Sequence, residues 1–160
     1  MRIQSNRRNF LLAGVITSAV IWFASKEKFS EATGTLQTIK QMQNDLFPQA
    51  NPDKYMLIVF AHSRIDEDEK TYLKDGATWL NEEALEIYEK SYISLNAKDR
   101  QRVLISFSSH EWGESYIHKI LTYTMEEYLG DPIYGGNKNE AGWKFLAHVG
   151  GKPSPKKAYL

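Results

Sequence analysis

The chain of 160 residues carries 20 basic and 20 acidic side chains and contains no cysteine. The absence of cysteine excludes disulfide bonds, thiolate-ligated zinc, iron-sulfur clusters, covalently attached c-type haem and cysteine nucleophiles from this chain. When residues 1–24 are set aside, 17 basic and 20 acidic residues remain, a formal charge of −3. The electrostatics of such a mildly acidic domain exclude a nucleic-acid-binding protein.

The first 24 residues have the features of an export signal. Arg7 and Arg8 stand just ahead of Phe10 and Leu11, and an apolar run follows. This run is shorter than the roughly 20 apolar residues that a transmembrane helix usually needs. An arginine pair at this place is typical of twin-arginine signals, whereas an ordinary secretory signal, the alternative, lacks the pair. Residues 1–24 are therefore predicted to be a twin-arginine signal or, if they are not cleaved, an anchor.

The twin-arginine route carries folded proteins across the bacterial inner membrane, and its cargo usually folds in the cytoplasm because it must first acquire a redox cofactor. This chain has no recognisable cofactor motif of its own. We therefore expect it to escort a partner that holds the cofactor. The twin-arginine translocase is then also a partner, and the predicted location is the periplasm, in association with the inner membrane.

Behind the signal, residues 25–34 are polar and typical of a flexible stem. Helical spacing follows, and the first predicted helix ends near Pro48. Its inward residues are predicted to be Leu36, Ile39, Met42, Gln43 and Leu46. The apolar run Tyr55–Ala61 is predicted to be a buried helix, and the charge-rich Ile65–Asp75 to be solvated surface or the first turn of a helix.

Three further helices complete a helical domain of residues 35–130. A core helix is predicted over Ala77–Tyr92, a second begins at an Asn96 cap, and a third spans Glu114–Leu129, with Gly130 ending it in left-handed geometry. The residues expected to face inward are Trp79, Leu80, Ala84, Ile87, Tyr88, Val103, Leu104, Phe107, Ile117, Ile120, Leu121, Met125 and Tyr128. The fold class is therefore all-α: a small bundle of about four or five helices, with an N-terminal signal or anchor helix and an irregular Gly/Pro-rich C-terminal arm.

Residues 131–160, called the arm below, differ in composition from the helical domain. Turn-forming Gly, Pro, Asn and Asp are frequent, which keeps the backbone extended or turning. Tyr134 and Trp143 are the natural anchors of such a segment, because aromatic side chains bury a large area with little loss of entropy. The arm is expected to lie over either the chain's own bundle or a partner protein, and the sequence leaves both alternatives open.

The arm contains two short motifs that identify a family. Their residues are Asp131, Pro132, Ile133, Tyr134, Gly135, Gly136 and Asn137, followed by Gly142 and Trp143. Behind an N-terminal Arg-Arg-x-Phe-Leu pattern, this combination resembles the gluconate 2-dehydrogenase subunit 3 family. Leu95–Arg100 also resembles that family's segment of cap and helix ahead of the arm. The ending Val149–Pro153 departs from the family's usual Pro-Gly close.

The resemblance implies a small, cofactor-free accessory subunit of a periplasm-facing gluconate (sugar acid) 2-dehydrogenase. In such a complex FAD is held by a large flavoprotein subunit, and electrons pass through a haem c cytochrome subunit to the respiratory chain. No catalytic, cofactor-binding or metal-binding residue is then expected in this chain. The residues predicted to contact the large subunit are Asp131, Pro132, Tyr134, Gly135, Gly136, Asn137, Gly142 and Trp143.

A second function is also compatible with the sequence. In a continuous helix His110, Glu114 and His118 would lie on one face and offer nitrogen and oxygen ligands to zinc or iron. Gly113 weakens a helix at this point, and Glu114 occupies the place of the second histidine of the metalloprotease motif His-Glu-x-x-His. The same three residues can also be interpreted as a surface or subunit-interface cluster. If they are instead a metal site, the chain is a stand-alone periplasmic helical protein.

Overall fold

The computed structural model describes residues 34–50, 55–62, 64–150 and 155–157. Residues Thr35–Leu160 form one compact unit. The predicted signal or anchor, and all of the predicted stem except Gly34, lie outside the described residues. The division into signal, stem, helical domain and arm therefore stays a prediction.

Every regular element in the described part of the chain is helical, which confirms the predicted all-α class. The first helix covers residues 34–46. The α-helices that follow are α2 (Tyr55–Ala61), α3 (Glu67–Tyr88), α4 (Ala97–Phe107), α5 (Glu111–Leu129) and α6 (Ala141–Phe145). Single 3-10 turns lie between them: η1 (Pro48–Ala50), η2 (Tyr92–Ser94), η3 (Pro132–Tyr134) and η4 (Lys138–Glu140). The arm is therefore partly helical, not irregular throughout.

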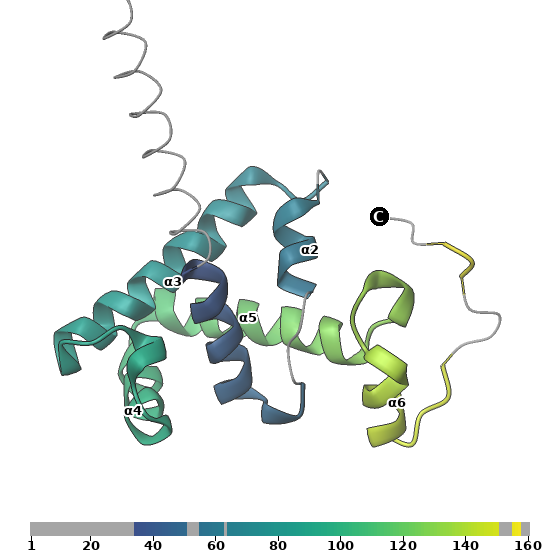
Figure 1. The fold of residues 1–160 in the computed structure, drawn as a ribbon. Coiled ribbons are helices and arrows are strands. Elements are labelled where there is room, and N and C mark those ends of the chain that lie inside the picture. The colour runs from purple at the N-terminus through teal and green to yellow at the C-terminus, as the bar shows by residue number, and fades with distance from the viewer. Residues whose placement is uncertain (1–33, 51–54, 63, 151–154, 158–160) are drawn as a thin grey trace, which may run out of the picture. The chain divides into compact units, whose positions relative to one another are not determined.

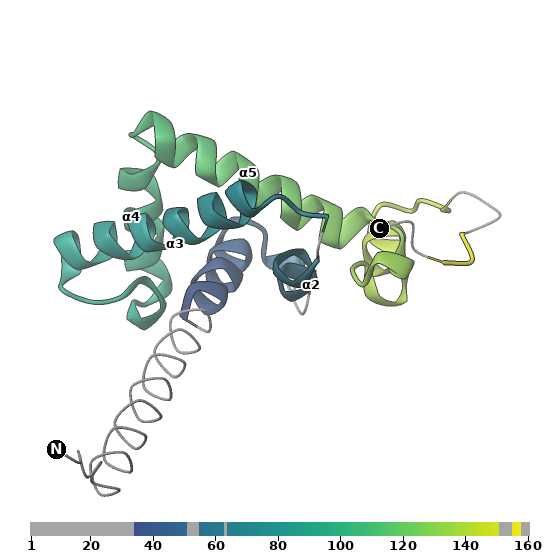
Figure 2. The same ribbon diagram turned by 90° about the horizontal axis from the view of Figure 1, so that it is seen from above.

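The two longest of these helices, α3 and α5, form the frame of the bundle. The views in Figures 1 and 2 agree that α4 lies at one end of α5 and α6 beyond its other end. Figure 2 shows helix 34–46 and α2 on the same side of α5. The arm is thus attached at the end of α5 that is far from α4.

Local capping residues explain where the helices begin. Asn96 Oδ1 accepts a hydrogen bond from the Asp99 amide at 3.0 Å, as predicted, and starts α4. Asp66 Oδ1 accepts one from the Asp68 amide at 3.2 Å and starts α3, whose first turn is acidic. The charge-rich segment is therefore a helix first turn, and α3 begins ten residues earlier than the expected Ala77.

The core confirms most of the predicted inward residues. Its buried members are Ile39, Met42, Met56, Val59, Leu73, Ala77, Leu80, Ala84, Tyr92, Leu95, Val103, Leu104, Phe107, Tyr116 and Ile120. The Tyr116 ring fits against Gly76, where a Cβ would lie 2.0 Å from Tyr116 Cε2. Its hydroxyl donates to the Leu73 carbonyl at 2.8 Å, so a fully buried tyrosine joins α3 to α5 without an unpaired polar atom.

Some of the predicted inward positions are wrong. Ile87 is 43% exposed, and in α2 only one face is buried, because Ile58 is exposed. On α5, Leu121 and Met125 are partly exposed. The buried face of α5 is instead formed by Gly113, Tyr116, Ile120, Thr124, Glu127 and Tyr128.

The expected left-handed geometry at Gly130 is also wrong, because its φ is −64°. A Cβ at this position would lie 2.4 Å from the Glu126 carbonyl oxygen. Glycine is therefore required here by the close approach of its backbone to the last turn of α5, and not by a positive φ.

Candidate partner-binding arm and the Asp45 cluster

The described part of the arm packs against the C-terminal end of α5 (Figures 1 and 2). The last carbonyl groups of any α-helix lack donors within the helix and need partners from elsewhere. The arm supplies such donors to Glu127, Leu129 and the adjoining Gly130. The arm motif thus acts first as a cap on its own helix.

Asn137 is the centre of this cap. Its backbone amide donates to the Glu127 carbonyl at 2.5 Å and its side-chain Nδ2 to the Gly130 carbonyl at 2.9 Å. Its Oδ1 accepts a hydrogen bond from the Gly142 amide at 2.8 Å. Asn137 is buried and has a φ of +43°, a left-handed conformation that asparagine tolerates better than most residues. One side chain therefore ties both halves of the arm to α5.

Two glycines of the motif allow the arm to come this close to α5. A Cβ at Gly136 would lie 2.3 Å from the Glu127 carbonyl oxygen. A Cβ at Gly142 would lie 1.9 Å from the Tyr128 carbonyl oxygen. Neither distance is compatible with any other residue unless the backbone moves, so both glycines are required by the packing.

The remaining motif residues shape the turns. The Trp143 indole Nε1 donates to the Leu129 carbonyl at 2.6 Å. Asp131 Oδ1 accepts from the Ile133 amide at 3.0 Å and caps η3, after which Gly135 takes a left-handed φ of +89°. Among the predicted partner contacts, the residues that keep some exposed surface are Asp131, Pro132, Tyr134, Gly135 and Trp143.

Three exposed apolar side chains lie close together in the sequence just after the motif, and the sequence reasoning missed them. Phe145, Leu146 and Val149 are 61%, 56% and 77% exposed, and are called the apolar tip below. Phe145 touches the bundle at one edge, with its ring centroid 6.1 Å from that of Tyr128. One sequence signal would have revealed the tip. Three large apolar residues fall within five consecutive positions, inside a segment that is otherwise rich in Gly, Pro and Lys.

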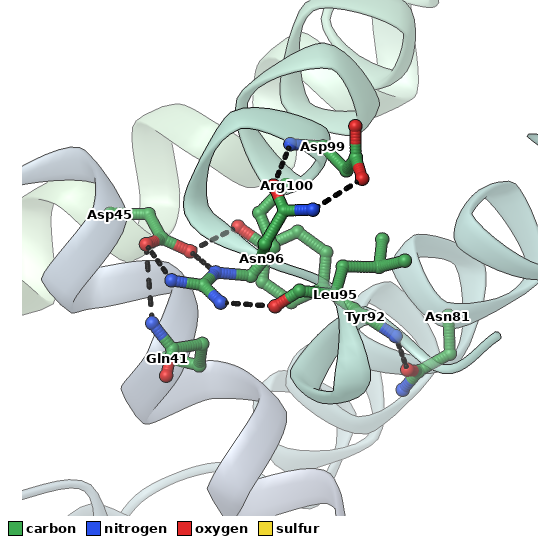
Figure 3. Close-up of polar contacts among 8 residues, drawn as sticks. All are labelled: Gln41, Asp45, Asn81, Tyr92, Leu95, Asn96, Asp99 and Arg100. Carbon is green, nitrogen blue, oxygen red and sulfur yellow. Dashed lines mark hydrogen bonds and ion pairs between the residues drawn. The ribbon is translucent and has the colours of Figure 1, made fainter. Parts of the chain in front are cut away.

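A second cluster, the Asp45 cluster, joins helix 34–46 to the start of α4 (Figure 3). The Asp45 carboxylate accepts from Arg100 Nε at 2.7 Å and Nη2 at 3.0 Å. It also accepts from the Tyr92 hydroxyl at 2.7 Å and from Gln41 Nε2 at 3.1 Å. Arg100 Nη1 donates to the Leu95 carbonyl at 2.6 Å. Since a carboxylate has about four lone-pair sites, all of them are occupied.

The electrostatics of this cluster favour a fixed ion pair beside a neutral phenol. Burial raises the pKa of the Tyr92 hydroxyl, and the hydrogen bond and charge of Asp45 raise it further. The hydrogen bond to Asp45 raises the pKa of the Arg100 guanidinium. The Leu95–Arg100 segment therefore has a structural role, in which it docks α4 on helix 34–46.

The structure does not bring all three predicted metal ligands to one place, although His118 lies near Glu114. His110 is the residue just before α5, where its Nε2 lies 3.9 Å from Glu83 Oε2 of α3 and its ring stacks on Trp112. His118 Nε2 lies 3.9 Å from Glu114 Oε1 on the exposed face of α5. In the part of the chain that the structure describes, no three His, Asp or Glu side chains are grouped as a metal site requires. The geometry thus gives the metal-site alternative no support.

The predicted export-signal residues Arg7, Arg8, Phe10 and Leu11 lie outside the described residues. None of the described helices combines the length and the apolar character that crossing a membrane requires.

Residues 17–151 match the model of a family described as gluconate 2-dehydrogenase subunit 3. No curated protein and no solved structure matches the chain. The matched range contains the Asp45 cluster, the capping motif of the arm and the apolar tip.

Proposed function

The chain belongs to the gluconate 2-dehydrogenase subunit 3 family, and from this we propose that it is the non-catalytic small subunit of a periplasm-facing, membrane-associated flavin-dependent dehydrogenase. It escorts the FAD-bearing large subunit through export and stabilises that subunit in the assembled complex. A c-type cytochrome is a further partner that accepts the electrons. Oxidation of gluconate or a related sugar acid belongs to the flavin of the large subunit.

The family match is the observation that carries this proposal. The contacts within the bundle support a scaffolding role, because its ionisable groups join helices to one another. Asp45 pairs with Arg100 at 2.7 Å. Glu69 of α3 accepts from Tyr123 of α5 at 2.8 Å and pairs with Lys119 at 3.1 Å. These ionisable side chains thus connect secondary-structure elements and stabilise their packing.

The escort role is supported by the pattern Arg7-Arg8-Asn9-Phe10-Leu11. A twin-arginine signal on a subunit that holds no cofactor is useful if a partner that does hold one is exported together with it. One signal then serves two folded chains.

The test is to replace Arg7 and Arg8 by lysine in the native host. Lysine keeps the charge but is not equivalent to arginine in specific recognition. We expect the flavin-bearing subunit to accumulate in the cytoplasm and gluconate-dependent dye reduction in the periplasm to fall to background. Both are measured by fractionation, flavin absorbance and an acceptor-dye assay.

Arg2→Lys is the matched control, since it makes the same change in the same positive segment but outside the pair. It should leave export intact. Normal export of the flavin-bearing subunit in the Arg7→Lys/Arg8→Lys variant would contradict the escort role.

A further inference from the structure

We propose that the apolar tip is the surface through which this chain binds the flavin-bearing subunit of its dehydrogenase, an inference that rests on the proposed function. The tip consists of Phe145, Leu146 and Val149, each more than half exposed. Large apolar side chains gathered on a surface mark interaction sites more often than single exposed ones do. The other exposed large aliphatic side chains of the described residues are distributed over α2, α3, η2 and α4, as Ile58, Leu85, Ile87, Ile93 and Ile105.

The tip is held in place before any partner arrives. Trp143 and Gly142, which precede it, are fixed on the carbonyl end of α5. The His148 amide donates to the Trp143 carbonyl at 2.8 Å, which turns the chain back within the tip. A surface that is ordered in the free protein loses less entropy on binding, so even a small apolar area is effective there.

Charge indicates the kind of partner. Residues 131–160 contain five basic and two acidic residues, a formal charge of +3, whereas residues 35–130 contain ten basic and sixteen acidic residues, a formal charge of −6. Lys138, Lys144, Lys156 and Lys157 of the arm are exposed. An apolar tip on a positively charged arm fits a partner surface that combines an apolar pocket with negative charge, and it repels a second copy of the same arm.

Family membership selects the occupant. The family is described as a subunit of a dehydrogenase, so another subunit must contact this chain. Anionic lipid would also attract a basic, apolar surface and is therefore tested as the competing occupant.

The experiment compares the full-length, carboxyl-terminally tagged chain with its Phe145→Glu/Leu146→Glu variant, both expressed in the native host. The large subunit that co-purifies is identified by its FAD absorbance and its sequence. We expect the variant to retain about one tenth, or less, of the flavoprotein that the wild type retains. A loss of this size is typical when central apolar anchors are removed. Leu85→Glu/Ile105→Glu is the matched control, because it places the same two charges on equally exposed aliphatic positions of α3 and α4. It should retain the flavoprotein.

Phe145→Ser/Leu146→Ser serves as a second variant, and circular dichroism verifies that every variant keeps the helical fold.

If no flavoprotein co-purifies with the wild type, the proposed function is wrong, and the inference is wrong with it. If the wild type and both tip variants retain flavoprotein equally, only the inference is wrong. Retention of flavoprotein together with loss of binding to phosphatidylglycerol vesicles would assign the tip to the membrane instead. Dimerisation that the tip variants abolish, with flavoprotein retained, would assign it to a second copy.

Discussion

The Asp45 cluster and the arm use opposite means to hold one segment of chain on another. The Asp45 cluster joins two helices through a nearly buried ion pair whose acceptor sites are all filled from within the chain. The arm is held by neutral donors on backbone carbonyls, and its outer side exposes apolar groups. The comparison shows that the first contact is closed to any partner, whereas the second fixes a surface that remains accessible.

The largest effect is expected from Asp45→Ala, which tests the closed contact. Removal of the carboxylate leaves the Arg100 guanidinium nearly buried without its counter-ion, and the Tyr92 hydroxyl loses its acceptor. Breaking such a pair costs about 3 to 4 kcal/mol in the free energy of unfolding. Urea denaturation followed by circular dichroism measures it. Arg102→Ala, which removes an exposed pair with Asp99, should give no measurable change. Similar midpoints for the two variants would show that the Asp45 cluster is not a stabilising tie.

Gly142→Ala is expected to have the next largest effect and tests how closely the arm approaches α5. The added Cβ would lie 1.9 Å from the Tyr128 carbonyl oxygen, so the arm must shift or detach. Overpacking of this kind costs about 2 to 3 kcal/mol. The expected result is rapid proteolysis after Leu129 with the bundle intact. Gly34→Ala, where a Cβ would meet nothing within 4 Å, is the control. An arm equally protected in both variants would mean that it does not depend on this contact.

Asn137→Ala tests the hydrogen bonds of the cap and should cost about 1 to 2 kcal/mol, because the Gly142 amide loses its acceptor in a buried place. Asn137→Gly loses the same bonds but relaxes the left-handed φ, so it should be the less harmful of the two. Hydrogen exchange of the Gly142 amide reports the release directly. Asn139→Gly, a change at an exposed left-handed position, is the control. Slow exchange of the Gly142 amide in Asn137→Ala would contradict this description of the cap.

The smallest effect is expected from Tyr55→Phe, which tests a titrating contact between α2 and α5 that lies outside both the Asp45 cluster and the arm. Burial and the nearby Glu126 raise the pKa of the Tyr55 hydroxyl to about 12, from 10. A raised folded-state pKa means that the neutral phenol is favoured in the fold. The contribution of the neutral Tyr55 hydroxyl to the free energy of unfolding is therefore complete below pH 10 and is lost as the pH rises through 12. Tyr55→Phe should consequently lose less stability than the wild type over this window, as measured by denaturation midpoints at both pH values.

The arm's attachment involves no ionising side chain in its bonds from Asn137 and Trp143. Proteolytic release of the arm should therefore not follow the titration of Tyr55. If the denaturation midpoints of Tyr55→Phe and of the wild type fall equally between pH 10 and pH 12, Tyr55 is not a cause of the loss of stability at high pH.

Elements with local signals could be predicted from the sequence. Asn96 caps α4 through an amide only three residues away, and Pro48 stands just beyond the end of helix 34–46. Both effects depend on neighbouring residues, so a pattern in the sequence is sufficient to detect them. The inward residues of α4, Val103, Leu104 and Phe107, were predicted for the same reason.

Burial that depends on distant partners could not be predicted in this way. Glu127 is buried on α5, where Gln43 Nε2 donates to its Oε2 at 3.3 Å from 84 positions away in the chain. Thr124 is also buried on this face, where its hydroxyl is satisfied by donating to the Ile120 carbonyl of its own helix. These polar residues take the inward face, and Leu121 and Met125 are left partly exposed.

The candidate site shows the same division. The motif from Asp131 to Trp143 stands out in the sequence, and its members are close together in the structure. That Asn137 and Trp143 bind the carbonyl end of α5 follows only from three-dimensional packing, because those carbonyls have no sequence signature. The contact of the motif residues with a partner protein stays a prediction.

The capping of α5 by Asn137 and Trp143 makes the arm's position conditional on that helix being complete. A chain in which the last turn of α5 has not formed has no carbonyl end for the arm to bind, and so displays no ordered tip. If the tip recruits the proposed flavin-bearing subunit, this dependence would act as a checkpoint, in which only a correctly folded molecule of this subunit joins its partner.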